Sequence, residues 1–169
     1  LAALTCSQGV STGGSNILSG DFNTLSASTS NAVLGNRNRF VGSSYNNVFG
    51  DLNSLARSNS NGVVGAQNKF LDSNYNYNVG NGNFFSGSNG IGNFGDNNIM
   101  RDSNYITNIG NGNVYRNANG NTNTGDLNRY MNSNSNINNG FTNTFIDANG
   151  NKVTGEFNTM GNANTNVVY

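Results

Sequence analysis

The chain contains no histidine, no proline and no tryptophan, and it has one cysteine, Cys6, among 169 residues. Without histidine, the Ser-His-Asp and Cys-His catalytic arrangements and every imidazole metal site are excluded. With one cysteine, no disulfide can form within the chain, so Cys6 is a free thiol or bridges two molecules. We therefore expect a non-enzymatic protein with no cofactor and no metal.

Charge and long apolar runs are also scarce. Only 9% of the residues are charged and the formal net charge is zero, so the chain has no basic footprint for nucleic acid or an acidic membrane surface. No segment reaches the roughly 18 apolar residues of a membrane span. The opening LAALTCSQ is too short and uncharged for a complete signal peptide, and we expect it to begin a mature chain.

Asparagine, glycine and serine dominate instead, in a strict cycle of 15 residues. The composition alone matches a prion-like polar tract, but a disordered chain has no reason to keep a register. SNGVVGAQNKFLDSN begins at Ser60, between YNNVFGDLNSLARSN at Tyr45 and YNYNVGNGNFFSGSN at Tyr75. The cycle runs from residue 15 to residue 164 without insertion or deletion, which predicts stacked repeats.

The positions of one cycle are numbered here as columns 1 to 15, starting at Ser15. Column 9 is asparagine in all ten cycles, and column 2 is asparagine except at Ile91 and Ile106. Column 11 is always Leu, Phe, Tyr or Met, and column 14 is always Ser or Ala. Column 6 is always glycine, predicted to form a corner: Gly20, Gly35, Gly50, Gly65, Gly80, Gly95, Gly110, Gly125, Gly140 and Gly155.

This pattern predicts an all-β fold. Columns 2, 4 and 6 share one parity, and so do columns 9 and 11, as in strands with one buried face. Each cycle predicts two short strands, near columns 2 to 5 and 9 to 12, joined by a Gly-(Asp/Asn)-x-Asn corner and a Ser/Ala-Asn corner. The frequency of Gly and Asn excludes helices. We predict a single β-solenoid, a two-sided β-roll rising about 4.8 Å per coil.

One domain over residues 1–169 is expected, with ten regular coils over 15–164 and a partial coil over 165–169. Residues 1–14 are interpreted as a degenerate first coil, because several of them are small or apolar where columns 1 to 14 require it. About eleven coils then span roughly 50 Å. The matching residues, at columns 2, 4, 6 and 14, are Ala2, Leu4, Cys6 and Gly14.

The predicted core is a narrow strip in which column 4 faces column 11, as Val63 faces Phe70. Asparagines at the ends of the strip are expected to stack amide on amide, so that each donates and accepts along the axis. The column 2 ladder comprises Asn16, Asn31, Asn46, Asn61 and Asn76. The column 9 ladder comprises Asn23, Asn38, Asn53, Asn68, Asn83, Asn98, Asn113, Asn128, Asn143 and Asn158.

From residue 78 to residue 138, column 4 itself becomes asparagine. We favour a third amide ladder packed against column 11. Two alternatives remain open: a polar channel or ligand line, and a one-residue slip that turns Val79, Phe94 and Ile109 inward. The asparagines concerned are Asn78, Asn93, Asn108, Asn123 and Asn138.

Carboxylates are the remaining candidates for chemistry, and they gather in column 7. We interpret them as turn formers, because Asn or Ala often replaces them and no site collects several acids, as a glycosidase pair or a calcium site requires. They are Asp21, Asp51, Asp96, Asp126 and Glu156.

Two surfaces are candidates for contact with a partner. Column 5 places six consecutive apolar residues in a stripe roughly 25 Å long, whereas column 10 is mixed and solvated. The stripe comprises Leu34, Phe49, Val64, Val79, Phe94 and Ile109. The ends of the rod show no polar terminal unit, and an exposed sheet edge invites pairing. The residues expected at such an end-to-end contact are Leu4, Cys6, Val167, Val168 and Tyr169.

The columns resemble the Asn/Val/Gly repeat of the grass ice-binding proteins, whose β-roll reads N-x-V-x-G-x-x-N-x-V. The matching quartets are Asn31-Val33-Gly35-Asn38, Asn46-Val48-Gly50-Asn53, Asn61-Val63-Gly65-Asn68 and Asn151-Val153-Gly155-Asn158. This resemblance implies the β-roll fold and ice binding. The stacked G-x-x-N coils are also similar, more loosely, to curli-type fibre subunits.

Together these features predict a secreted structural protein that stacks head to tail into an extracellular fibre or surface layer, with itself as the main partner and other surface or matrix components as further partners. Ice binding is the alternative, and a glycan-binding adhesin shaft is the third interpretation.

Overall fold

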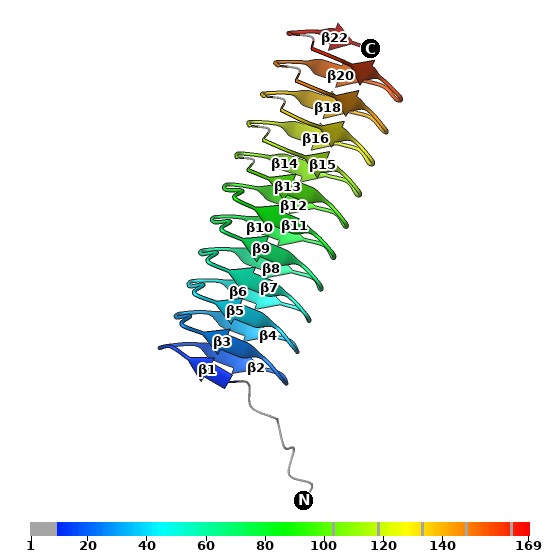
Figure 1. Ribbon diagram of the computed structural model, residues 1–169. Coiled ribbons are helices and arrows are strands. Elements are labelled where there is room, and N and C mark those ends of the chain that lie inside the picture. The colour runs from blue at the N-terminus through cyan, green and yellow to red at the C-terminus, as the bar shows by residue number, and fades with distance from the viewer. Residues whose placement is uncertain (1–9, 103, 118, 133, 148, 163) are drawn as a thin grey trace, which may run out of the picture.

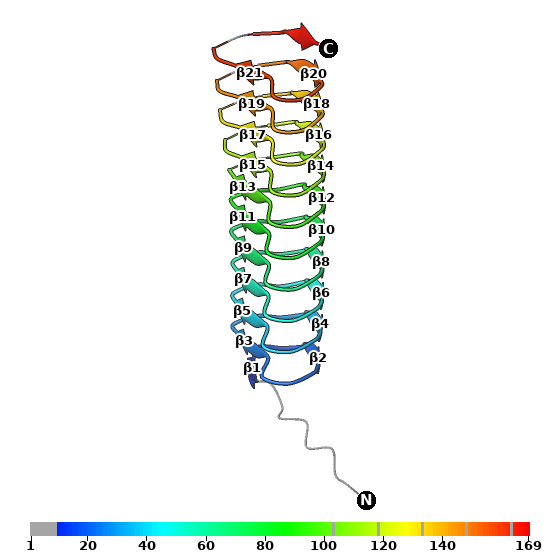
Figure 2. The ribbon, with the colours of Figure 1, turned by 90° about the vertical axis from the view of Figure 1, so that its right-hand side faces the viewer.

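The computed structural model describes residues 10–102, 104–117, 119–132, 134–147, 149–162 and 164–169. Over these residues the chain is a β-solenoid, a rod in which successive coils stack along one axis (Figure 1 and Figure 2). The described residues form two parallel sheets of eleven strands each, one on either side of the rod. The predicted fold class is therefore confirmed.

The strands alternate between the two sheets along the chain. The odd-numbered sheet contains β1 (Val10–Thr12), β3 (Thr24–Ser26), β5 (Arg39–Val41), β7 (Ser54–Ala56), β9 (Lys69–Leu71), β11 (Phe84–Ser86), β13 (Ile99–Arg101), β15 (Val114–Tyr115), β17 (Arg129–Tyr130), β19 (Thr144–Phe145) and β21 (Thr159–Met160). The even-numbered sheet contains β2 (Ile17–Ser19), β4 (Ala32–Leu34), β6 (Asn47–Phe49), β8 (Gly62–Val64), β10 (Tyr77–Val79), β12 (Gly92–Phe94), β14 (Thr107–Ile109), β16 (Thr122–Thr124), β18 (Ile137–Asn139), β20 (Lys152–Thr154) and β22 (Val167–Val168).

Neighbouring strands pair in the 15-residue register, as Thr24 pairs with Arg39. The first pair differs: Val10 aligns with Thr24, an offset of 14 residues, so the first described coil is one residue short. The strands occupy columns 3 to 5 and 10 to 12, which is one residue shorter at the start than the sequence predicts. The asparagines of columns 2 and 9 therefore lie just before the strands, at the corners.

From β3 onward, the middle residue of each three-residue strand points into the core. Val48, Val63, Leu55 and Phe70 are buried, with exposed fractions of 1% or less. Phe70 and Phe85, in adjacent coils, meet edge to face with 4.6 Å between ring centroids. The core is one side chain deep from each sheet, so polar side chains must close its two ends.

Asparagine ladders close those ends, as predicted. Asn46 Nδ2 donates to Asn31 Oδ1 of the preceding coil at 3.0 Å and to the Ser58 carbonyl at 2.9 Å, while the Asn46 backbone N–H donates to the same Oδ1 at 3.0 Å. In column 9, Asn53 bonds Asn38 in the same way, and its Nδ2 also donates to Gly65 O at 2.8 Å. Each repeating amide thus uses both donors and both lone pairs, and these hydrogen bonds offset the free-energy cost of burying it.

Column 4 asparagines form the third ladder. Asn93 Nδ2 donates to Asn78 Oδ1 at 2.7 Å, and Asn108 Nδ2 donates to Asn93 Oδ1 at 2.7 Å. The register is unbroken there, since Asn78 aligns with both Val63 and Asn93, so the slip is wrong. The five amides are buried, with exposed fractions of at most 1%, so they form a closed ladder and do not line a channel.

This central region also changes column 2. Ile91 and Ile106 replace asparagine and are buried, so two coils exchange a polar and an apolar side chain between columns 2 and 4. The exchange leaves one defect among the described residues: the buried Nδ2 of Asn121 has no hydrogen-bond partner, because Ile106 below it carries no amide oxygen. Column 9 is linked to the new ladder, as Asn113 Nδ2 donates to Asn108 Oδ1 at 3.3 Å.

Each coil turns through several backbone positions with positive φ. Column 6 glycines have φ between 110° and 156°, and a Cβ at these residues from Gly20 to Gly140 would meet the carbonyl of the next column 6 glycine. Columns 1, 8 and 13 are also left-handed yet carry ordinary residues, such as Tyr75, Leu52 and Arg57. These side chains point into solvent, so no glycine is required and the sequence gives no signal of the turn.

Column 14 forms a further ladder that the sequence analysis did not anticipate. The Ser58 N–H donates to Ser43 Oγ at 3.0 Å, and Ser58 Oγ donates to the Ala56 carbonyl at 2.9 Å. The described serines of this column, Ser28, Ser43, Ser58, Ser73 and Ser88, are fully buried. A small hydroxyl or methyl is what fits inside this corner.

Candidate functional site

The column 5 stripe lies on the outside of the even-numbered sheet. Its exposed fractions are between 41% and 52% for Leu34, Phe49, Val64, Phe94 and Ile109, and Val79 is half-buried. In-register pairing places each side chain above the next along the axis, as Phe49 aligns with Val64. The six side chains therefore form one continuous apolar ridge, with the placement that the sequence predicted.

The rest of this face lacks charge as far as β18. Its outward residues in columns 3 and 5, from Ile17 to Asn139, contain no charged side chain, and the first one reached is Lys152 in β20. Beside the stripe lie small or uncharged residues such as Ala32, Gly62 and Thr107. The face is thus suited to an uncharged partner, because no ion has to lose its hydration on contact.

The odd-numbered sheet differs in charge. Its outward residues in columns 10 and 12 include five cations and no acid. One of these cations, Lys69, stands over a ring, with its Nζ 5.5 Å from the Phe84 ring centroid. The five are Arg39, Lys69, Arg101, Arg116 and Arg129, all exposed.

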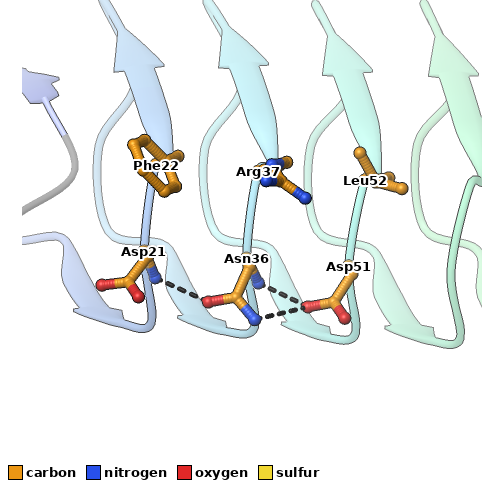
Figure 3. Close-up of a pocket in the computed structure, with 6 residues that line it drawn as sticks. All are labelled: Asp21, Phe22, Asn36, Arg37, Asp51 and Leu52. Atoms are coloured by element: carbon orange, nitrogen blue, oxygen red, sulfur yellow. Dashed lines mark hydrogen bonds between the residues drawn. The ribbon is translucent and has the colours of Figure 1, made fainter. Parts of the chain in front are cut away.

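Five of the eight acids lie in column 7, on the corner that follows the even-numbered strands, and Asp72, Asp102 and Asp147 lie in column 13 on the other corner. Asp21 N–H donates to Asn36 Oδ1 at 2.7 Å, and the Asn36 N–H donates to Asp51 Oδ1 at 2.5 Å (Figure 3). Beside this outer ladder the side chains of Phe22, Arg37 and Leu52 form one wall of a shallow pocket. Because neutral Asn36 separates the two carboxylates, like charges do not meet in adjacent coils. Asp21 and Asp51 thus take part in a ladder of hydrogen bonds along this corner.

One exposed ion pair bridges the other corner. Arg57 Nε lies 2.7 Å from Asp72 Oδ1, and Arg57 Nη2 lies 2.9 Å from Asp72 Oδ2. The hydrogen bond from Arg57 lowers the pKa of Asp72 below its ordinary value, and the same bond and the carboxylate charge raise the pKa of Arg57. The pair is solvent-exposed, so salt screens it.

The residues expected at end-to-end contacts are only partly described. Val167 and Tyr169 are exposed by 58% and 89%, and Val168 packs partly against the core. Leu4 and Cys6 lie outside the described residues.

One group of exposed residues was missed by the sequence analysis: the tyrosines of column 1. Tyr45, Tyr75 and Tyr105 project from the corner before the even-numbered strands and are exposed by 66%, 73% and 78%. They were missed because a search for a period of one coil averages out a feature that recurs every two coils. A search for a period of two coils could have revealed them.

Over the described part of the chain, no three His, Cys, Asp or Glu residues are close enough together to hold a metal ion. No helix in those residues has the length and apolar character needed to cross a membrane. Comparisons with known protein families and with curated proteins found no match to the chain.

Proposed function

We propose that this chain is a non-enzymatic structural protein that assembles with copies of itself into an extracellular fibre or surface layer. The observation that carries the proposal is the exposed apolar stripe on a face without charge. A contiguous apolar ridge of this kind on a soluble protein is typical of a surface that contacts a partner. A second copy is the partner whose shape and polarity match it along its whole length.

The continuity of the stripe from coil to coil supports side-by-side association. Two copies related by a two-fold axis would bring stripe against stripe, so that Phe49 and Val64 of one lie against the same residues of the other. Sheets pack about 10 Å apart when side chains of this size interdigitate. The cations of the odd-numbered sheet and the acids of column 7 stay outside that contact and remain hydrated.

The ladders support stacking along the axis with a fixed direction. In columns 2 and 9 the backbone N–H groups donate to the asparagine Oδ1 of the preceding coil, as those of Asn46 and Asn53 do to Asn31 and Asn38. Two rods stacked head to tail would continue this direction, whereas two like ends would oppose donor with donor or acceptor with acceptor. Val167, Val168 and Tyr169 would lie at such a junction.

Electron microscopy and light scattering of the purified protein over a range of concentrations test the proposal. The double variant Val64→Lys/Phe94→Lys places two charges on the stripe and is expected to abolish side-by-side association. The matched control, Thr24→Lys with Thr159→Lys, places the same charges on the odd-numbered sheet and is expected to leave association unchanged. Strictly monomeric wild-type particles at high concentration would contradict the proposal.

A second candidate is ice binding, favoured by the same charge-free face on a rigid rod and by the resemblance of the Asn/Val/Gly quartets. The outward side chains differ in size from coil to coil, as Phe49 and Val64 do, so a fit to an ice lattice would be partial. Thermal hysteresis and recrystallisation assays on wild type and Val64→Lys/Phe94→Lys separate the candidates. Ice binding predicts that monomers shape ice crystals and that the double variant does not.

A further inference from the structure

The three tyrosines of column 1, Tyr45, Tyr75 and Tyr105, are called here the tyrosine row. They occupy every second coil, and the intervening positions hold Ser60 and Gly90. Two strand spacings separate successive tyrosines, which is roughly 10 Å. The N–H of a column 1 residue donates to the column 15 carbonyl of the preceding coil, as Tyr75 does to Asn59 at 3.1 Å, so column 1 residues stack along the rod axis. The corners of successive coils lie in a straight row (Figure 2).

The Tyr105 ring lies along the surface of the rod. A Cβ built on Gly90 would be 3.1 Å from Tyr105 Cδ1 and 3.4 Å from its Cε1, so this ring covers the glycine of the preceding coil. Tyr77 covers Gly62 in the same way, with its Cδ2 3.0 Å from the corresponding Cβ position. In both cases a large ring in one coil covers a glycine in the preceding coil.

From this geometry we infer that the tyrosine row binds an extended β-1,4-linked polysaccharide running along the rod axis. The C–H bonds on one face of a β-linked pyranose carry partial positive charge, which the negative face of an aromatic ring attracts. Successive sugars of such a chain are turned by half a rotation, so the same face recurs once per disaccharide. A disaccharide of an extended chain is close in length to two strand spacings, the spacing of the row.

The surroundings of the row fit an uncharged, hydroxyl-rich ligand. Columns 15, 1, 2 and 3 carry no charge in any coil from residue 44 to residue 107. Polar groups flank the rings: Asn47 and Thr107 are exposed in column 3, and Asn74 and Asn104 are half-buried in column 15. These amides and hydroxyls can bond sugar hydroxyls while the rings stack.

Three weak stacking contacts on one chain act together, because binding at the first ring raises the local concentration at the others. Affinity should therefore depend on the spacing of the rings and on the number of sugars. Oligosaccharides of six units are expected to bind much more tightly than disaccharides.

Titration calorimetry with cellohexaose and with chitohexaose, and sedimentation with insoluble cellulose and chitin, test the inference. Tyr75→Ala is expected to weaken binding roughly three- to tenfold, as expected for the loss of one aromatic contact. The control Phe22→Ala removes a ring that is exposed by 61% on the opposite corner and is expected to change nothing. Maltohexaose, which is α-linked and curved, is expected not to bind.

The decisive variant moves one ring by a single coil. Ser60→Tyr/Tyr75→Ser keeps the composition and the number of exposed rings but breaks the two-coil spacing, so binding is expected to fall as far as in Tyr75→Ala. Unchanged binding in this variant would overturn the inference, as would the absence of binding to both β-linked ligands. Assembly of the tyrosine variants by electron microscopy is expected to be normal, so failure here is distinguishable from failure of the proposed self-assembly.

Discussion

The carbonyl oxygen of Gly65 lies where a Cβ on Gly50 would have to be placed, closer than 3.0 Å to that position. Gly50 also has a φ of 140°, which L-residues rarely adopt. The same relationship recurs in successive coils, as between Gly35 and Gly50. Steric closeness between coils, together with backbone conformation, thus requires glycine in column 6.

Gly50→Ala is therefore expected to lower the free energy of unfolding by roughly 3 kcal/mol or more, since the clash is with backbone and the φ is strained. Gly92→Ala is the control, because a Cβ at Gly92 meets nothing within 4 Å. Denaturant unfolding followed by circular dichroism measures both. Equal stability of the two variants would show that the coils can separate to admit a methyl group.

Asn68 tests the buried ladders. Its Nδ2 donates to Asn53 Oδ1 and Gly80 O, and its Oδ1 accepts from Asn83 N–H and Nδ2–H. Asn68→Ala leaves these groups without partners and is expected to cost about 3 kcal/mol, measured by denaturant unfolding. Asn59→Ala, in the half-buried outer ladder, is expected to cost clearly less, and an equal loss would contradict the distinction between inner and outer ladders.

The variant Asn68→Asp adds a dependence on pH. A carboxylate there would face the Asn53 Oδ1 and Gly80 O acceptors, so burial and these oxygens would raise its pKa above the unfolded value of about 3.9. A raised folded-state pKa means that the variant is most stable below the unfolded pKa and loses stability as pH rises through the folded pKa. Melting temperatures at pH 3.5 and pH 7 should show this loss relative to wild type, and a difference of the opposite sign would contradict it.

Column 4 asparagines are expected to behave as a unit. Asn108→Val alone deprives Asn113 Nδ2 and Asn123 Nδ2 of an acceptor and is expected to cost about 2 kcal/mol, although valine occupies this column elsewhere. Replacing all five by valine is expected to cost less than five times the loss of stability in Asn108→Val. The reason is that the neighbouring column 4 amides, which would otherwise be left unpaired, are removed as well. Simple additivity in urea unfolding would contradict this coupling. The five positions are Asn78, Asn93, Asn108, Asn123 and Asn138.

The Arg57–Asp72 pair predicts a small effect at acidic pH. Because the pKa of Asp72 is lowered in the folded state, its contribution is present above the unfolded pKa of aspartate, about 3.9, and is lost as pH falls through the lowered value. Asp72→Asn should remove this part of the pH dependence, and molar salt should reduce it in wild type. Between pH 5.5 and 8 we expect a nearly constant melting temperature, since the chain contains no histidine.

Much of this architecture follows from the sequence because the repeat is strict. A period of 15 residues with alternating parity identifies which side chains share a column, and stacking then requires the same column to meet itself in the next coil. The ladders of Asn46 and Asn53, the inward Val63 and the outward Val64 could be predicted for this reason. The boundaries of the strands were predicted one residue too long, since Asn46 and Asn53 hold the corners rather than the sheets.

What only the tertiary structure decided lies in contacts between coils. Sequence alone left three readings of Asn93, and the paired register with the bond to Asn78 selected the buried ladder. The left-handed corners at Leu52 and Arg57 carry no sequence signal, because their side chains point to solvent. The ring of Tyr105 over Gly90 depends on rotamer and on the neighbouring coil, neither of which a single cycle contains. The sequence by itself determined the coil and the inward or outward side of each column, and the stacking of coils decided how polar groups are satisfied and which surfaces face a partner.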